Sequence, residues 1–148
     1  MFYLIRHGQT TFNVQKRHQG WVDSELTELG RQQARYAGLT LLSLGIGSES
    51  TVFTSPLGRA AGTAKIISET LNVKSQPLVD HDLKEIGMGT WEGKTEAEFN
   101  PQATQMSLFS PDGESIRTLS ARLLNLLNGL QNTQQHRGSS SLMARQGE

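Results

Sequence analysis

Short apolar runs alternate with segments of helical periodicity, and this alternation constrains the fold more than any other feature of the sequence. Runs that fit short buried strands occur at residues 2–5, 51–54 and 78–79. Residues 27–44 and the segment after Pro56 carry apolar residues at helical spacing. A strand–helix–strand–helix order is typical of α/β domains with a mainly parallel sheet. We therefore predict an α/β fold, with a mainly parallel sheet flanked by helices.

A last helix is predicted from about residue 114 to residue 130, where Leu and Ile recur every three or four positions. Residues 131–148 are polar, rich in Gln and Ser, and have no such pattern, which is typical of a disordered tail. We therefore expect one domain over residues 1–130 and a tail over residues 131–148. The last helix of an α/β domain should lead back into a buried strand, so we expect the C-terminal strand to be missing.

The charges of the chain are balanced, since Lys plus Arg and Asp plus Glu both number 14. This balance does not indicate a nucleic acid or membrane partner, because both bind basic surfaces. The absence of cysteine excludes disulfides, thiolate metal sites and cysteine nucleophiles. The four histidines lack metal-ligand spacing, so we expect neither a metal nor another cofactor. The sequence leaves the oligomeric state open.

No apolar run approaches the ~20 residues that a membrane span needs. The first residues show neither the basic leader nor the cleavage site of a signal peptide. We therefore expect a cytoplasmic protein.

Arg6-His7-Gly8 stands where the first predicted strand ends. In open α/β sheets, ligands bind beyond the carboxyl ends of strands. A histidine there can be held by a hydrogen bond at one ring nitrogen while the other attacks phosphorus. The guanidinium of Arg6 matches phosphate oxygens. By itself the tripeptide is weak evidence, because such tripeptides also occur by chance.

The tripeptide opens an ordered series of short motifs. In chain order these are Arg6-His7-Gly8-Gln9-Thr10, Asn13, Gln19-Gly20, Leu26-Thr27-Glu28-Leu29-Gly30 with Gln33-Ala34, Ser55-Pro56-Leu57-Gly58-Arg59-Ala60 with Thr63-Ala64, Leu83-Lys84-Glu85-Ile86-Gly87, and Trp91-Glu92-Gly93. The series resembles the histidine phosphatase superfamily, which includes the cofactor-dependent phosphoglycerate mutases. The resemblance covers residues 1 to about 130.

The resemblance implies a role for seven residues. It implies that His7 is the nucleophile that forms a phosphohistidine, and that Glu85 is the acid that protonates the leaving oxygen. The positions it implies for binding the substrate and its phosphate are Arg6, Asn13, Gln19, Gly20 and Arg59. Phosphoryl transfer depends mainly on positioning and on neutralising oxygen charge, which two guanidinium groups can supply without a metal.

Two of these roles have a structural alternative. Arg59 could pair with a carboxylate, and Glu85 could be a solvated loop acid with other glutamates close by in sequence. We expect Trp91 to pack rather than to stack on a substrate. The remaining histidines, at positions 18, 81 and 136, are expected at the surface or in turns.

The sequence departs from the family near its C-terminus. The family has a second essential histidine after a short apolar strand, as Ser or Thr followed by His-Gly, and His136 does not match this pattern. The missing pattern is present in a shifted reading frame if Ser139, Ser140 and Ser141 have TCN codons and Leu142 has a suitable codon. Read two bases later, this part of the message then encodes three apolar residues, a small residue, His and Gly. Our hypothesis is that this chain is a frameshifted, truncated version of an enzyme of roughly 200 residues. We expect its stability and its activity to be lower than those of the intact enzyme.

Three functions are therefore open. The first is a phosphomonoester hydrolase, in which water releases phosphate from the phosphohistidine. The second is a mutase, which returns the phosphoryl group to another hydroxyl of the substrate. The third is a non-catalytic phosphate-binding domain. The compact segment after Glu85 favours the hydrolase, since the mutases carry long insertions there. The substrate would be a small phosphorylated metabolite, which the sequence does not identify.

Overall fold

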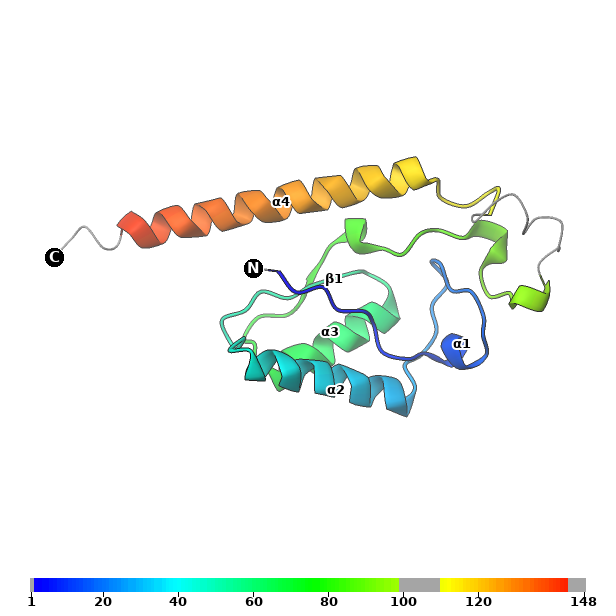
Figure 1. Cartoon of the computed structure of the whole chain (residues 1–148), viewed down its shortest axis with the longest axis horizontal. Coiled ribbons are helices and arrows are strands. Elements are labelled where there is room, and N and C mark those ends of the chain that lie inside the picture. Colours follow the sequence, from blue (N-terminus) through cyan, green and yellow to red (C-terminus); the bar gives the residue numbers. More distant parts are fainter. Residues whose placement is uncertain (1, 99–109, 144–148) are drawn as a thin grey trace. The chain divides into compact units, whose positions relative to one another are not determined.

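The computed structural model describes residues 2–98 and 110–143, with side chains through residue 131. It forms two compact units, one up to residue 114 and one from residue 115 (Figure 1). The first unit carries helices and a small parallel sheet, so the predicted α/β class is confirmed. The predicted absence of a C-terminal strand concerns the end of the chain and stays a prediction.

Two helices of the first unit lie where the periodicity predicts them. Helix α2 spans Glu28–Ser43, and Thr27 is its N-cap because its side chain accepts a hydrogen bond from Gly30 N–H. Helix α3 spans Gly58–Thr70 with Leu57 as N-cap. Pro56 therefore stands one residue before the cap, and not in the first turn as we expected.

These two helices pack side by side and form the core of the unit (Figure 1). Leu41 of α2 and Ile67 of α3 are buried together with Leu71, which follows α3. A Cβ atom at Gly38 would lie 2.7 Å from the Cβ of Thr70. Glycine at this position therefore permits the close approach of the two helices.

The sheet consists of β1, Phe53–Thr54, and β2, Leu78–Val79, which pair in parallel with Phe53 opposite Leu78. Both lie within the predicted strands. Thr54 is buried and is followed directly by the loop into α3. The parallel pair therefore places the start of α3 at the carboxyl edge of the sheet.

The expected buried strand at residues 2–5 is wrong for the described chain. Residues 2–9 belong to no strand, and Phe2, Tyr3, Leu4 and Ile5 are all exposed, Leu4 at 94%. An apolar run becomes a buried strand only where neighbouring strands bond its backbone and helices cover its faces. The ladder among the described residues is limited to β1 and β2.

Four short elements escaped the sequence analysis. They are helix α1, Thr11–Val14, and the 3₁₀ turns η1, His81–Leu83, η2, Gly89–Trp91, and η3, Glu96–Glu98. Each is too short to show a period. Helix α1 and η2 lie in the motif series, so they matter for the site.

The second unit is helix α4, Ile116–Met143, which confirms the predicted helix but continues beyond Leu130. Residues 131–137 contain neither Gly nor Pro, so nothing in that sequence ends a helix. The side chain of His136 and residues 144–148 lie outside the described residues. The boundary at residue 130 stays a prediction. None of the described helices combines the length and the apolar character that crossing a membrane requires.

Candidate active site

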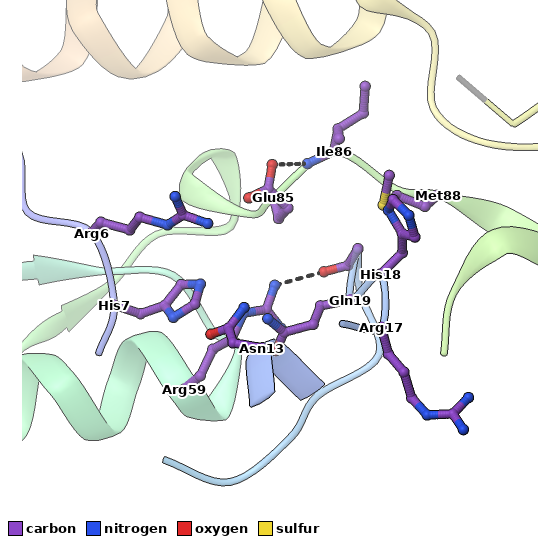
Figure 2. A pocket seen from close by; sticks show the side chains of 11 residues that line it. Arg6, His7, Asn13, Arg17, His18, Gln19, Arg59, Glu85, Ile86 and Met88 are labelled. Atoms are coloured by element: carbon purple, nitrogen blue, oxygen red, sulfur yellow. Dashed lines mark hydrogen bonds between the residues drawn. The ribbon is translucent and has the colours of Figure 1, made fainter. Parts of the chain in front are cut away.

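The seven predicted site residues line one cavity of the first unit, with a volume of about 240 Å³ (Figure 2). Side chains of Arg6 and His7 face those of Asn13 and Arg59, and Glu85 lies across the cavity from them. Four further residues also line it: Arg17, His18, Ile86 and Met88. The structure therefore brings together predicted site residues that are up to 79 positions apart in the sequence, from Arg6 to Glu85.

His7 is oriented by one ring nitrogen. Its Nδ1 lies 2.8 Å from the carbonyl oxygen of Gly8. A carbonyl only accepts hydrogen bonds, so Nδ1 carries the proton and Nε2 is left with its lone pair. Burial lowers the pKa of His7 below its ordinary value of 6.5, and the positive charges of Arg59 and Arg6 lower it further, against the raising effects of the Gly8 hydrogen bond and of Glu85. Both effects favour the neutral ring that a nucleophile needs.

The loop that carries His7 is fixed by contacts to α2 and α3. Gly8 N–H donates to Thr63 Oγ1 over 3.1 Å, and that hydroxyl donates in turn to the carbonyl of Arg59. A Cβ atom at Gly8 would lie 2.2 Å from the carbonyl oxygen of Gly30 in α2. Gln9 N–H donates to the side chain of Gln33 over 2.8 Å. The glycines and polar residues of the motifs thus hold the histidine loop in place.

Asn13 is held by the cap of α1. Its Oδ1 accepts from the backbone N–H of Thr10 (2.9 Å), while Thr10 Oγ1 accepts from Asn13 N–H (3.2 Å). This reciprocal pair uses the amide oxygen of Asn13. The amide nitrogen therefore remains to face an anion in the cavity, which agrees with a neutral donor.

Arg59 is nearly fully buried, with 2% of its surface exposed. Its guanidinium donates to the carbonyls of Gly20 (2.8 Å) and Val22 (3.1 Å) and to Asp23 Oδ1 (3.4 Å). Within the described part of the chain, these bonds use three of the five N–H donors of a guanidinium. Two donors remain for a phosphate.

Asp23 is a site residue that the sequence analysis missed. Its carboxylate pairs with the Arg59 guanidinium and accepts from the backbone N–H groups of Gly58 and Arg59 at the start of α3. A carboxylate there complements the positive end of the helix. Arg59 therefore does pair with a carboxylate, which was the alternative to phosphate binding. The pair still leaves two N–H donors of Arg59 for a phosphate.

Gln19 and Gly20 form the wall beside Arg59. Gln19 is buried, and its Oε1 accepts from Thr10 Oγ1 (3.0 Å) and Ser24 Oγ (2.9 Å). Gly20 has φ of +54°, and a Cβ atom there would lie 2.4 Å from Glu92 Oε1. Glycine adopts this left-handed backbone without strain and permits the close contact with Glu92.

Glu85 is exposed at the opposite wall, and its Oε1 accepts from Ile86 N–H over 3.0 Å. Its backbone carbonyl accepts from Trp21 Nε1 over 2.7 Å. The sequence analysis did not single out Trp21, because a contact between segments 64 positions apart leaves no local pattern.

Two other cavity residues, His18 and Arg17, need separate comment. His18 was expected at the surface or in a turn, but it is half-buried and lines the cavity. Arg17 points away from the cavity (Figure 2), because its guanidinium donates to the Gly93 carbonyl (2.6 Å) and pairs with Glu98 (3.3 Å). The guanidinium groups that face the cavity in Figure 2 are therefore those of Arg6 and Arg59.

The described residues contain no group of three or more His, Asp or Glu side chains that could hold a metal ion. The charge of a phosphate in this cavity would be met by Arg6, Arg59 and neutral donors.

The sequence matches a known protein family. The family described as the histidine phosphatase superfamily (branch 1) matches residues 2–144. This range contains the whole motif series and extends past residue 130, where the recognisable motifs end.

Curated relatives and solved structures carry related names. A probable phosphoglycerate mutase GpmB of Proteus mirabilis (strain HI4320) is 36% identical over 135 residues, which cover 85% of this chain and 60% of that protein. The corresponding protein of Enterobacter sp. (strain 638) is 36% identical over 130 residues, which cover 82% and 58%. A mycobacterial glucosyl-3-phosphoglycerate phosphatase solved with VO3 superposes with a TM-score of 0.74 at 33% identity, covering 86% of this chain and 62% of that one. The chain thus spans about three fifths of the length of these relatives.

Proposed function

The chain belongs to the histidine phosphatase superfamily, and we propose that it is a metal-independent phosphomonoester hydrolase that acts through a phosphohistidine on His7. The observation that carries this proposal is the orientation of His7. Its Nδ1 is bound to the Gly8 carbonyl, which leaves Nε2 with its lone pair in a cavity lined by Arg6, Arg59 and Glu85.

The first half-reaction transfers the phosphoryl group to the protein. His7 Nε2 forms a bond to phosphorus while the bond from phosphorus to the leaving oxygen breaks. Glu85 gives its proton to that oxygen, so that an alcohol leaves rather than an alkoxide. The position of Glu85 across the cavity from His7 supports this role (Figure 2).

The second half-reaction restores the protein. Water attacks phosphorus, and the Glu85 carboxylate accepts a proton from that water. The nitrogen–phosphorus bond breaks, inorganic phosphate leaves, and His7 becomes neutral again. No step needs a reactant other than the phosphomonoester and water.

The phosphate oxygens are held by fixed donors. Arg59 presents its two remaining N–H donors from a buried, hydrogen-bonded position, and Asn13 presents its amide nitrogen. Arg6 is exposed and adds a second positive charge. Donors that are already oriented lower the barrier without reorganising during the reaction.

The substrate we propose is a small phosphorylated metabolite. A volume of about 240 Å³ lies just below the usual range of ligand pockets, which fits a small substrate. The relatives are named for a phosphoglycerate mutase and for a glucosyl-3-phosphoglycerate phosphatase, so the names alone favour neither hydrolysis nor isomerisation. We favour hydrolysis because the segment between Glu85 and the last helix is compact, whereas the mutases carry long insertions there.

We propose, in addition, that turnover is low. The sequence has no Ser-His-Gly or Thr-His-Gly after a C-terminal apolar strand, and the family's second histidine binds the transferring phosphoryl group. A pocket with one phosphate ligand fewer stabilises the transition state less.

The test is hydrolysis of p-nitrophenyl phosphate with EDTA present, comparing the wild type with His7→Ala and His7→Asn. We expect activity that survives EDTA, is absent from both variants, and is accompanied by acid-labile phosphorylation of His7. Activity that EDTA abolishes, or that persists in the variants, would contradict the proposal. With a phosphoglycerate as substrate, release of free phosphate supports the hydrolase, and conversion to the isomeric phosphoglycerate supports the mutase.

A further inference from the structure

We propose that Trp21 and Glu92 are positioning residues that hold Glu85 at the cavity. The inference rests on the proposed function, because it concerns the acid of that reaction. Both residues act on the backbone of the segment that carries Glu85, and neither is among the seven residues assigned above.

Trp21 contacts the backbone of Glu85 and both sides of its segment. Its indole Nε1 donates to the Glu85 carbonyl over 2.7 Å. Lys84 Nζ lies 3.4 Å from the centre of the indole ring, a cation–π contact. A Cβ atom at Gly87 would lie 3.0 Å from the same ring. The residue before Glu85, Glu85 itself and a residue shortly after it thus all touch one side chain.

Glu92 ties the Trp21 loop to the far end of the same segment. Its Oε1 accepts from the backbone N–H of Trp21 (2.8 Å) and from that of Met88 (2.9 Å). Gly20 packs against this carboxylate with no room for a side chain. One carboxylate oxygen therefore bridges the loop that supports Arg59 through the Gly20 carbonyl and the loop that carries Glu85.

Glu85 depends on this support because its own segment is irregular. Residues 84–88 lie between the turns η1 and η2 and belong to no helix or strand in the described structure. Proton transfer requires the acid within hydrogen-bonding reach of the leaving oxygen, and small displacements reduce such steps strongly. The hydrogen bonds of Trp21 and Glu92 fix the acid relative to the phosphate-binding side of the cavity.

The test compares two substrates with different leaving groups. A variant that misplaces the acid slows only the substrate whose leaving group needs a proton, whereas a variant that is merely less stable slows both. An alkyl phosphomonoester needs a proton on its leaving oxygen, whereas p-nitrophenolate leaves without one. Trp21→Phe keeps the ring over Gly87 but removes the N–H donor. We expect it to lower the rate of leaving-group release from glycerol 3-phosphate about 10- to 100-fold, and to change that from p-nitrophenyl phosphate less than about threefold.

Trp91→Phe is the matched control, since it makes the same chemical change at the other tryptophan of the chain. We expect it to leave the ratio of the two rates unchanged. Equal losses on both substrates in Trp21→Phe, or no change on either, overturn the inference. Activity that persists in His7→Ala would instead contradict the proposed function, so the two failures are distinguishable.

Glu92 is tested by a pair of variants. Glu92→Ala removes the acceptor for both N–H groups, and Glu92→Gln keeps an oxygen at that position. We expect Glu92→Ala to lower the ratio of the alkyl to the nitrophenyl rate as Trp21→Phe does, and Glu92→Gln to restore it. Equal ratios in Glu92→Ala and in the wild type would overturn the role of Glu92.

Hydrogen exchange gives a readout that needs no turnover. The Trp21 indole N–H is assigned by its absence from the NMR spectrum of Trp21→Phe. We expect its exchange to be slowed in the wild type and to become faster in Glu92→Ala. Exchange as fast in the folded protein as in the chain in urea would overturn the hydrogen bond to Glu85.

Discussion

At the residue scale, three groups of the site are bound to the protein through some of their polar atoms and keep other polar atoms for a ligand. His7 is bound through Nδ1, Asn13 through its amide oxygen, and Arg59 through three of its N–H donors in the described structure. A side chain fixed in this way loses little further freedom when a ligand binds. The geometry therefore favours a small, highly charged ligand that must meet several donors at once.

Arg59→Ala is expected to weaken both phosphate binding and folding. The change removes the guanidinium that donates to the carbonyls of Gly20 and Val22 and to the Asp23 carboxylate. We expect the free energy of unfolding in urea to fall by about 2–5 kcal/mol, and inhibition by phosphate to weaken. Arg6→Ala is the control: Arg6 is exposed, so it should weaken phosphate binding while changing stability by less than about 1 kcal/mol. A fully stable Arg59→Ala would contradict the role of these bonds.

The ionisation of His7 predicts how the nucleophile depends on pH. Burial, Arg59 and Arg6 lower its pKa below 6.5. The neutral ring is the nucleophile, so His7 is active above its own pKa and is lost as the pH falls through it. We expect the rising limb of the pH profile of kcat/KM to lie below pH 6.5. An NMR titration should show the same pKa for the ring, and a value above 6.5 would contradict the prediction.

The contribution of Arg6 to that pKa can be measured separately. Its positive charge disfavours a second positive charge on the ring. Arg6→Gln is therefore expected to raise the pKa of His7, while Arg35→Gln, an exposed arginine of α2, serves as control and should leave it unchanged. High salt should reduce the difference between Arg6→Gln and the wild type.

The motif series predicted which residues meet in the cavity, but it did not predict what holds them. His7, Arg59 and Glu85 were found because their residue types occur in a fixed order. Asp23 and Trp21 were missed because their partners stand 35 to 64 positions away, and no local pattern records such a contact. Thr10 gave a usable signal, since Thr is a preferred N-cap residue and Thr10 caps α1.

At the scale of elements, α2 and α3 position the site by close contact between backbones. The start of α2 meets the His7 loop at Gly8 and Gly30, and Gly38 permits α2 to approach α3. Periodicity predicted both helices, because each has an apolar side that the other covers. The prediction from the short apolar run at residues 2–5 was wrong, since four apolar residues do not specify whether a neighbouring strand exists to pair with them.

Gly30→Ala is expected to displace the His7 loop. Its Cβ would lie 2.1 Å from the backbone oxygen of Gln9, which cannot move without moving the loop. We expect a loss of about 1–3 kcal/mol in the free energy of unfolding and a loss of activity larger than the loss of stability explains. Gly47→Ala is the matched control, since a Cβ there meets nothing within 4 Å. Unchanged stability and activity in Gly30→Ala would show that the loop is free to shift.

At the scale of the whole molecule, the exposed apolar residues 2–5 stand just before Arg6 and the nucleophile His7. The carboxyl end of such a segment places His7, so its order matters for catalysis. Apolar side chains in water contribute nothing to stability and invite association with other apolar surfaces. We therefore propose that residues 2–5 need a neighbouring strand to pair with their backbone and hold His7 in place.

The last prediction concerns the codons of residues 139–144. If this segment is read out of frame, Ser139, Ser140 and Ser141 are encoded by TCN codons, and Leu142 is encoded by CTC. Only this leucine codon places C before the AT of Met143 and so creates CAT, the codon for His. The final G of the Met143 codon and the GC of Ala144 then encode Gly. Sequencing the gene decides this, because an AGY serine codon or any other leucine codon excludes the shifted histidine.

If the codons agree, the chain expressed in the restored frame should bind less of an apolar dye, unfold at a higher urea concentration and hydrolyse p-nitrophenyl phosphate faster than this chain. Equal values for the two proteins would mean that residues 2–5 need no added strand.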